Sequence, residues 1–569
     1  MPRVTESGLL DGRQTSPERS PNPLERLHVQ AGSSQQYYLA DEEQSTYQET
    51  SIDDVDYPDA YTALLNALEV MESHFFEVSH GTWPQAIDWT AAVMGTQVSA
   101  TLAAMSEYLA LKPLPSTEEA RDHENLINRY FTQITSFYFG ENAFSLRTQA
   151  YDDMLWVVLD WLEAIQFIDL HSTLHYASSD HSNASAWYAR QFIPQYAHRA
   201  RLFYDLASRG WDDKLCGGGM TWNPYLAPYK NAITNELYIS AGVGMYLHFP
   251  GDSNSSPFLT NAELPPARAH DVRHLDNAVK AYKWLKESGM RNEQGLYVDG
   301  FHIKGWRGGK DGSNGTEKCD LRDSKVYTYN QGVLLSGLRG LWIATSFRPY
   351  LQDGHELLQS VIAATGWEDR DTDRKWRWAG LGRNGVLEEQ CDWSGTCSQD
   401  AQTFKGIFFH HLTLFCSPLP KGHDDRALHQ KSCDGYADWI RHNAFAAYVT
   451  RNEKGEFGQW WGRPSYRPHD STDEERYMQR PENEGTDYRN DGVPWNDIWR
   501  LPEDDVMYRP DYDAGYDKIH RSWRHLSTAE KPRRQDINDR GRGRTVETQS
   551  GGLAVLRALW KLVESRQEG

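Results

Sequence analysis

Two adjacent aspartates, Asp152 and Asp153, stand directly before a long apolar run in the stretch "QAYDDMLWVVLDWLEAI" at 149–165. An aspartate at the start of a helix accepts hydrogen bonds from free N–H groups and suits the positive end of the helix dipole. Paired carboxylates also carry out glycoside hydrolysis, and in retaining enzymes they lie about 5–5.5 Å apart. Neighbouring residues at a helix start can meet that spacing, so both capping and catalysis remain open at this point.

Other catalytic chemistries have little support in the sequence. It contains no G-x-S-x-G motif, no P-loop and no dinucleotide fingerprint. The stretch "HELLQ" has Gln359 where a zinc-protease helix needs its second histidine. His410 and His411 are adjacent, so on a helix they point about 100° apart and cannot share a metal; we expect them to pack in the core or to line the cleft. The sequence therefore predicts no metal and no organic cofactor.

The elements that must position the two aspartates are helices. About a dozen segments have apolar residues at helical spacing, and strand-like alternation is nearly absent. Some segments, such as 154–165, are apolar almost all round, whereas others, such as 279–289, have one polar face. Buried inner helices alternating with amphipathic outer helices predict an all-α ring of helical hairpins. The segments are 59–79, 85–111, 120–138, 153–168, 192–208, 230–248, 272–288, 330–346, 354–365, 403–416, 434–450 and 550–565.

The chain divides into a polar leader at 1–58, which we expect to be disordered, and a single catalytic domain at 59–569. Long irregular insertions interrupt the domain. The longest, at about 460–545, is polar and proline-rich, and loops of this length are usually functional or disordered. The others are expected at 249–271, 300–326 and 367–402.

The composition indicates a neutral partner. The formal net charge is −21, so a nucleic-acid or anionic-membrane surface is not expected. The chain contains 21 Trp and 30 Tyr, whose rings fit the C–H face of a sugar or, alternatively, fill a tryptophan-rich core. The sequence contains no run of about 18 apolar residues, so no integral membrane segment is predicted. The first residues contain no apolar signal region and the last residues no glycolipid-anchor tail, which keeps an intracellular location as the alternative.

The stretch "YDDMLWVVLDWLEAI" resembles the signature of glycoside hydrolase family 76, which contains the endo-α-1,6-mannanases and related fungal cell-wall enzymes. Further stretches match the family in order over about residues 60–460 and the last helix. They are "WDDKLCGGGMTWN" at 211–223, "YKNAITNELYISAGVGMYL" at 229–247, "GLYVDG" at 295–300, "YTYNQGVLLSGL" at 327–338, "GVLEEQCDWSGTCSQDAQTFKGIFFHHL" at 385–412 and "TQSGGLAVLRAL" at 548–559.

The resemblance implies an (α/α)6 barrel with a cleft at one end and a retaining cut at α-1,6-mannosidic bonds. It makes the adjacent pair catalytic, and we assign Asp152 as the nucleophile and Asp153 as the general acid/base. It also implies that α-mannan or a mannose-containing oligosaccharide is the partner and that the location is extracellular or in the cell wall. We expect a monomer.

Other matched positions are weaker predictions of substrate contact. The amides of Asn330 and Gln331 open a helix and could bind sugar hydroxyls or, alternatively, cap that helix. The remaining substrate-binding candidates are Tyr151, Trp222, Asp299, Glu389, Lys405, Trp460 and Trp461. Cys391 and Cys397 are close enough in sequence to form a disulfide.

The sequence leaves one rival function open and argues against two others. A transglycosidase would use the same aspartates but accept a sugar in place of water. A non-catalytic mannan-binding protein would not need both carboxylates, so retention of the pair and of Tyr151 argues against it. An isomerase would need inward-facing histidine bases in a suitable constellation, which the sequence does not offer.

Overall fold

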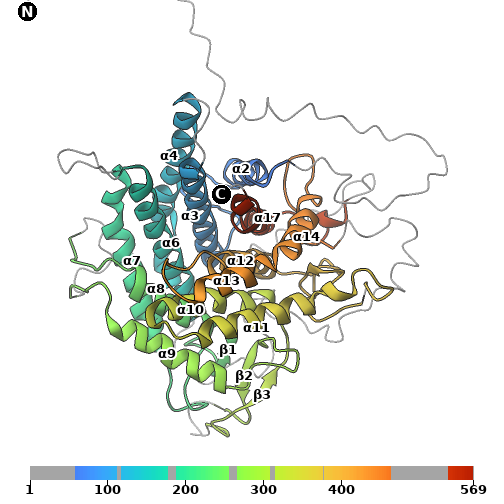
Figure 1. The fold of residues 1–569 in the computed structure, drawn as a ribbon. Coiled ribbons are helices and arrows are strands. Elements are labelled where there is room, and N and C mark those ends of the chain that lie inside the picture. The colour runs from blue at the N-terminus through green and yellow to red at the C-terminus, as the bar shows by residue number, and fades with distance from the viewer. Residues whose placement is uncertain are drawn as a thin grey trace, which may run out of the picture.

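The computed structural model describes residues 58–111, 117–176, 187–255, 265–307, 314–375, 377–462 and 536–567. The predicted leader lies outside these residues except for Pro58, as does most of the predicted insertion at 460–545. The described residues are mostly helical, and Figure 1 labels the helices along the chain.

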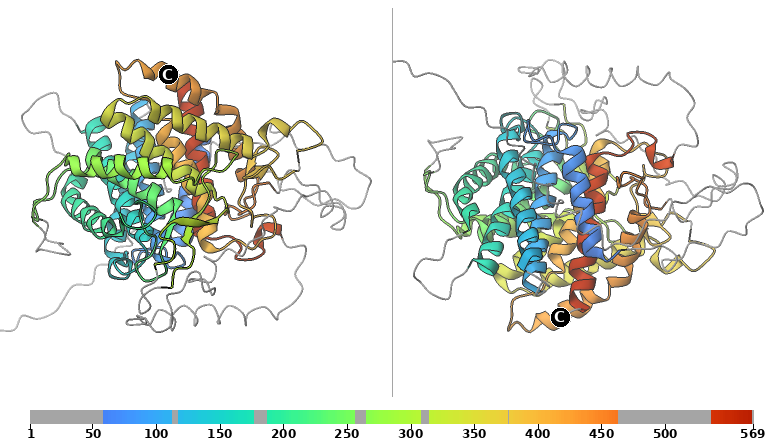
Figure 2. Two further views of the ribbon diagram at one scale, coloured as in Figure 1. Left: turned by 90° about the horizontal axis from the view of Figure 1, so that it is seen from below. Right: turned by 90° about the horizontal axis from the view of Figure 1, so that it is seen from above.

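Six inner helices form a closed ring within the described part of the chain. In ring order each packs against the next, and the last packs against the first. Figure 2 shows this closure, because the red C-terminal helix lies beside the blue N-terminal ones. The inner helices are α3 (Asp88–Leu111), α6 (Tyr151–His175), α8 (Ala232–His248), α10 (Thr328–Thr345), α12 (Gln399–Phe415) and α17 (Val546–Leu559).

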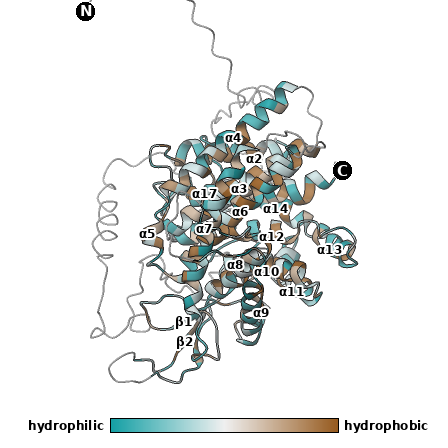
Figure 3. Ribbon diagram, turned by 90° about the vertical axis from the view of Figure 1, so that its left-hand side faces the viewer, coloured by the Kyte–Doolittle hydropathy of each residue, from teal (hydrophilic) through white to brown (hydrophobic). Residues whose placement is uncertain are grey.

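Six outer helices alternate with the inner ones along the sequence and complete the predicted (α/α)6 barrel. Their exposed faces are polar, as the teal colour of α9 in Figure 3 illustrates. The outer helices are α2 (Ala60–Val70), α4 (Thr117–Gly140), α7 (Ile193–Ala207), α9 (Val272–Glu287), α11 (Pro349–Ala364) and α14 (Ala437–Tyr448). A short helix, α13 (Asp425–Asp434), precedes the last of them. The all-α prediction and the helix positions are confirmed.

Glycines allow neighbouring inner helices to approach closely. A Cβ atom on Gly332 of α10 would lie 2.5 Å from the Cα of Phe408 on α12. A Cβ atom on Gly406 would lie 3.0 Å from the Cα of Gly551 on α17. A larger residue at Gly332 would therefore separate two inner helices, because the contacting atom belongs to the backbone and cannot rotate away.

Short strands occupy part of the segment that was predicted to be irregular at 300–326, so that prediction was wrong in detail. Strand β2 (Gly300–Ile303) lies between β1 (Tyr229–Asn231) and β3 (Cys319–Asp323) in an antiparallel sheet. A second hairpin joins β4 (Gly382–Arg383) to β5 (Val386–Leu387). Strands this short carry too few residues for alternation to be visible in the sequence.

Three disulfides use all six cysteines of the chain. The predicted Cys391–Cys397 bond is confirmed, with an S–S distance of 2.04 Å. The pairs Cys216–Cys319 and Cys416–Cys433 were not predicted, and the first joins residues 103 positions apart in the sequence. Partners so distant come together only through the fold.

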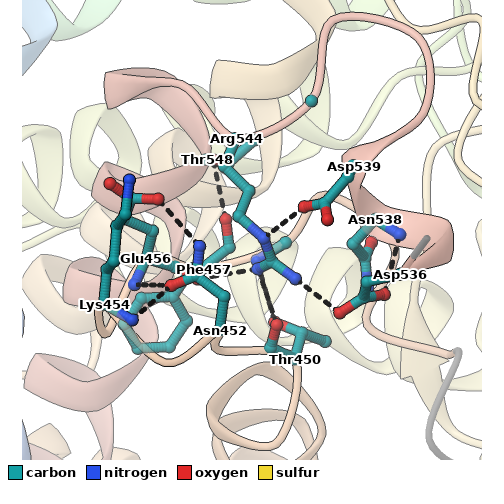
Figure 4. Close-up of polar contacts among 12 residues, drawn as sticks. Thr450, Asn452, Lys454, Glu456, Phe457, Asp536, Asn538, Asp539, Arg544 and Thr548 are labelled. Carbon is teal, nitrogen blue, oxygen red and sulfur yellow. Dashed lines mark hydrogen bonds and ion pairs between the residues drawn. The ribbon is translucent and has the colours of Figure 1, made fainter. Parts of the chain in front are cut away.

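Arg544 fastens the chain just before α17, as Figure 4 shows. Its guanidinium donates to the carbonyl oxygens of Thr450, at 2.6 Å, and Glu456, at 2.7 Å. It also pairs with Asp536, at 2.7 Å, and with Asp539, at 2.9 Å. Arg544 therefore ties residues 450–456, which precede the predicted insertion at 460–545, to the described last part of that insertion.

None of the helices that the structure describes is both long enough and apolar enough to cross a membrane.

Candidate active site

Helix α6 begins at Tyr151, so both aspartates lie in its first turn. The Asp153 carboxylate accepts a hydrogen bond from the Ala150 N–H at 3.1 Å, and the Asp152 carboxylate accepts one from the Asp153 N–H at the same distance. Ala150 has no side-chain acceptor, so Asp153 caps the chain just ahead of the helix. The capping interpretation is therefore correct for Asp153, but it accounts for only one of its two oxygens.

Trp222 contacts the pair from a loop outside α6. Its indole N–H donates to the Asp152 Oδ2 at 3.0 Å. Its backbone is fixed on both sides, because its carbonyl accepts the Tyr151 N–H at 2.9 Å and its own N–H donates to the Tyr229 carbonyl at 2.8 Å. The predicted binding residue Trp222 thus meets the predicted nucleophile through its polar edge.

The two carboxyls have different surroundings. Removal from water raises the pKa of Asp153 well above its usual range, and the neighbouring Asp152, Asp400 and Asp88 raise it further. The bond from the Ala150 N–H acts in the opposite direction. Burial and the neighbouring acids therefore favour the protonated form of Asp153, whereas Asp152 accepts the Trp222 indole N–H.

Three further residues near the pair, Asp88, Asp400 and Trp89, were not predicted from the sequence. Trp89 of α3 stacks on Trp156 of α6, with ring centroids 5.6 Å apart, and its N–H donates to the Asp400 carboxylate at 3.0 Å. Asp88 accepts a hydrogen bond from the Gln149 amide at 2.7 Å. Asp88 and Asp400 each lie in the first turn of an inner helix. That shared position was a usable signal, but only the order of helices around the ring brings them toward Asp153.

The predicted site residue Asp299 lies behind Trp222. Its buried carboxylate accepts the Tyr229 hydroxyl hydrogen bond at 2.6 Å. Tyr229 in turn lies edge-on to Trp222, with ring centroids 6.3 Å apart, and stacks on His302 at 4.2 Å. The structure therefore connects Asp299 to the aspartate pair through Tyr229 and Trp222.

Glu389 and Lys405 belong to a separate buried cluster. Glu389 accepts hydrogen bonds from the Thr328 N–H, at 2.9 Å, and from its hydroxyl, at 2.5 Å, where α10 begins. Lys405 pairs with Asp392 at 2.5 Å, and its ammonium lies 5.3 Å from the ring centre of Trp461. Burial raises the pKa of Glu389 to about 8. The Glu389 N–H also donates to the Asp392 carboxylate at 3.1 Å, so Asp392 joins Glu389 to Lys405, and Glu389 fixes the start of an inner helix.

The remaining tryptophan, Trp460, is buried at the described start of the predicted insertion. Its backbone N–H donates to the Asn538 side chain at 2.8 Å. The guanidinium of Arg540 lies 5.4 Å from its ring centre. It lines a small pocket together with Asp392 and Gln459. The structure thus places Trp460 with the Glu389 and Lys405 cluster.

The side-chain amides of Gln331 and Asn330, both predicted to contact sugar, differ in their hydrogen bonding. Gln331 accepts the Tyr297 N–H at 2.8 Å and donates to the carbonyls of Tyr297, at 2.8 Å, and Tyr327, at 3.0 Å. Its amide therefore binds the backbone of Tyr297 and Tyr327 and does not cap α10, which begins three residues earlier at Thr328. Asn330 is fully buried, and its amide has no hydrogen-bond partner among the described residues. Tyr151 is half-buried, and its ring fills the space beside Gly210.

The adjacent histidines pack as predicted. His410 contacts the Arg557 guanidinium at 2.8 Å, and His411 contacts the Ser336 hydroxyl at 2.8 Å. Two other clusters have ligand types and spacing that could suit a metal, but each includes disulfide-bonded cysteines, whose sulfurs are already used. One of them is His355, His429 and Cys433.

A closed ring of six helical hairpins defines an (α/α)6 barrel, and the two carboxyls at the start of one inner helix are groups that could carry out glycoside hydrolysis. The sequence model described as "Glycosyl hydrolase family 76" matches residues 71–466. The chain belongs to glycoside hydrolase family 76.

Fungal relatives resemble part of the chain. The mannan endo-1,6-alpha-mannosidase DFG5 of Saccharomyces cerevisiae is 24% identical over 253 residues, which are 42% of this chain and 44% of the relative. The protein of the same name from Candida albicans is 23% identical over 235 residues, or 40% and 42% of the two chains. The chain thus spans less than half the length of the curated relatives it matches.

Solved structures are also similar to the chain. The GH76A alpha-1,6-mannanase from Salegentibacter sp. HEL1_6 matches with a TM-score of 0.46 and 17% identity, covering 89% of this chain and all of that one. An inactive variant of that mannanase has been solved in complex with alpha-1,6-mannotriose. Dfg5 from Chaetomium thermophilum, in complex with glucosamine, matches with a TM-score of 0.45 and 17% identity over 74% of this chain and 86% of that one.

Proposed function

We propose that the protein is a retaining endo-α-1,6-mannosidase that cuts internal bonds of α-mannan. Membership of family 76 and the mannan endo-1,6-alpha-mannosidase names of the fungal relatives support the reaction class and the substrate. The observation that carries the proposal is the difference between two adjacent carboxyls at one helix start. Asp152 accepts an indole N–H, whereas Asp153 is surrounded by other acids.

In the first step the Asp152 carboxylate attacks the anomeric carbon of the mannose ring. The glycosidic C–O bond breaks, and Asp153 gives its proton to the departing O6 of the next sugar. The products of this step are a mannosyl ester of Asp152 and a shortened chain with a free hydroxyl. The raised pKa of Asp153 suits the role of proton donor, because it favours a carboxyl that still carries its proton when the C–O bond begins to break.

In the second step the Asp153 carboxylate takes a proton from water, and the resulting hydroxide attacks the anomeric carbon. The bond to Asp152 breaks, which restores the Asp152 carboxylate and protonated Asp153. Two inversions leave the anomeric configuration unchanged. Both steps need only the two carboxyls and water, so no cofactor takes part in the proposed mechanism.

We place the working protein outside the cell, as a monomer. Three disulfides support this location, because such bonds persist in oxidising compartments and are rare in the cytosol. Of the weaker candidates, Tyr151 remains a proposed sugar contact, because it directly precedes the pair and is half-buried. The Asn330 amide is fully buried, so a sugar would not reach it in this arrangement of the helices.

The proposal is tested by incubating the full chain with linear α-1,6-mannan and with α-1,6-mannotetraose. New reducing ends are measured, products are separated by length, and proton NMR gives the anomer released first. We expect shorter products with the α anomer first. Longer products in place of reducing ends would identify a transglycosidase, and binding without any new product would overturn the assignment as an enzyme.

A further inference from the structure

The indole N–H of Trp222 donates a hydrogen bond to the carboxylate of Asp152, the nucleophile of the proposed mechanism. We propose that Trp222 is a positioning residue for Asp152 and that it is not a stacking surface for sugar. This inference rests on the proposed function and adds to it a residue that governs the chemical steps. The tryptophan reaches Asp152 from a loop 70 positions away in the sequence.

The loop that carries Trp222 is held on three sides, so its indole is placed accurately. Thr221 donates its N–H to the Gly210 carbonyl at 2.8 Å. Met220 donates to the Asn235 side chain at 2.7 Å, and the same amide donates back to the Met220 carbonyl at 3.3 Å. Asn235 is fully buried on inner helix α8. The barrel itself, and not only the loop, therefore fixes the position of the indole.

A second set of contacts holds the indole from behind. Tyr229 lies edge-on to Trp222, and its hydroxyl donates to the buried Asp299 carboxylate at 2.6 Å. The Asp299 backbone is itself fixed, because its N–H donates to the Lys325 carbonyl at 2.8 Å and its carbonyl accepts the Ala232 N–H at 2.7 Å. This arrangement gives the predicted site residue Asp299 an indirect role, as the support of Tyr229.

The N–H of Trp222 acts on Asp152 in two ways. It completes a pair of donors, since one oxygen of Asp152 accepts the Asp153 N–H at 3.1 Å and the other accepts the indole at 3.0 Å. With a donor on each oxygen the carboxylate is held in one orientation toward the anomeric carbon. A hydrogen bond to the charged form also lowers the proton affinity of the carboxylate and favours its release from the sugar in the second step.

A Trp222→Phe variant separates positioning from stacking, because phenylalanine keeps an aromatic face but has no N–H. If Trp222 positions Asp152, we expect kcat on α-1,6-mannotetraose to fall by about 10- to 100-fold with KM changed by less than about twofold. The acidic limb of the kcat/KM profile should move to higher pH by about one unit. A raised KM with unchanged kcat and an unmoved limb would overturn the inference in favour of stacking.

The chain offers a matched control in Trp342→Phe. Trp342 is buried on α10, and its N–H donates to the Asp425 carboxylate at 3.0 Å, the same kind of contact at the same distance. Trp342→Phe should lose stability in thermal unfolding but keep kcat and the acidic limb. If both variants lose kcat equally, the effect of Trp222→Phe is one of folding and the inference fails.

A readout without substrate keeps this inference distinct from the proposed function. Carbon-13 NMR of labelled aspartate carboxyls, with Asp152→Asn as the assignment control, follows the titration of Asp152 in the wild type and in Trp222→Phe. We expect the pKa of Asp152 to rise in the variant. An unchanged titration would overturn the inference even if mannan is cut, and a raised pKa would support it even if the true glycan differs.

Discussion

Two pairs of adjacent acidic residues, Asp152–Asp153 and Glu388–Glu389, lie in the same barrel but in different surroundings. Glu388 and Glu389 follow strand β5 and are fully buried. Burial raises the pKa of Glu388 to about 7 and that of Glu389 to about 8. Burial also raises the pKa of Asp153. A raised pKa is thus common to both pairs and does not by itself identify the reacting one.

The partners of the two pairs distinguish them. Glu388 lies 3.4 Å from the Arg383 guanidinium, and Glu389 accepts both donors of Thr328. A buried Lys405 ammonium also favours the charged forms of both glutamates. Because these contacts are all made within the protein, we do not expect the two glutamates to take part in the reaction. A structural acid pair is therefore recognised by neighbouring cations and by its hold on a helix start.

The aspartate pair shows the opposite pattern. The donors to its carboxylates include the neutral N–H groups of the Trp222 indole and of the Ala150 and Asp153 backbone. The charged neighbours that raise the pKa of Asp153 are all carboxylates, namely Asp152, Asp400 and Asp88. Such surroundings favour a proton on Asp153, which suits the acid/base role that we propose for it in a retaining mechanism.

The largest expected effect comes from removing the charge of each pair in turn. Asp152→Asn and Asp153→Asn should each lower kcat on α-1,6-mannan by about 10³-fold or more, because each removes a group that reacts. Glu389→Gln should keep kcat within about threefold, since its partners lie in the structural cluster. Reducing-end assays on the three purified variants measure this. Loss of turnover in Glu389→Gln with native circular dichroism would show that the comparison is wrong.

The structural cluster should respond most in stability. Lys405→Met leaves Asp392 buried without its ammonium partner, so the free energy of unfolding should fall by about 3–5 kcal/mol. Lys280→Met is the matched control, because it breaks the exposed Lys280–Asp213 pair and should cost less than about 1 kcal/mol. Urea unfolding monitored by tryptophan fluorescence compares the two. Equal losses would show that the buried pair contributes no more than a surface one.

Stability should also fall as the pH rises from about 7 to 8, a range above the ordinary pKa of 6.5 in which buried histidines of lowered pKa, such as His355 and His429, are mostly neutral in both the folded and the unfolded chain. Burial raises the folded-state pKa of Glu72 and Glu389 to about 8 and that of Glu388 to about 7, above the ordinary value of 4.5. Their stabilising effect is therefore complete below pH 4.5 and is lost as the pH passes through the folded-state values. Urea midpoints at several pH values measure the slope, and Glu389→Gln should make it shallower. A slope of the opposite sign would contradict the assignment.

The smallest expected effect concerns the acids around Asp153. Asp400→Asn removes a negative neighbour, so the pKa of Asp153 should fall and the alkaline limb of the pH–rate profile should move down by less than about one unit. Asp425→Asn is the control, since Asp425 accepts an indole N–H in the same way but lies against Trp342. An alkaline limb that moves equally in both variants would mean that Asp400 has no special influence on Asp153.

Much of this architecture could be predicted from the sequence. The periodic segments coincide with the helices of the barrel. An inner helix that is buried on nearly all sides, such as α6, is recognisable in the sequence as a long apolar run. The Cys391–Cys397 disulfide was also predictable, since six positions of chain cannot separate its ends far. The short strands β1 to β3 and the disulfide Cys216–Cys319 were not, because their partners are distant in the sequence.

The candidate site divides in the same way. The sequence by itself determined the adjacent aspartates and the helix that begins at them, since both are local properties of residues 149–165. Only the tertiary structure decided which neighbour each carboxyl meets: the Trp222 indole on Asp152, and the carboxylates of Asp88 and Asp400 around Asp153. The physical reason is that proton affinity depends on burial and on charges brought together from three inner helices, and no local pattern records that arrangement.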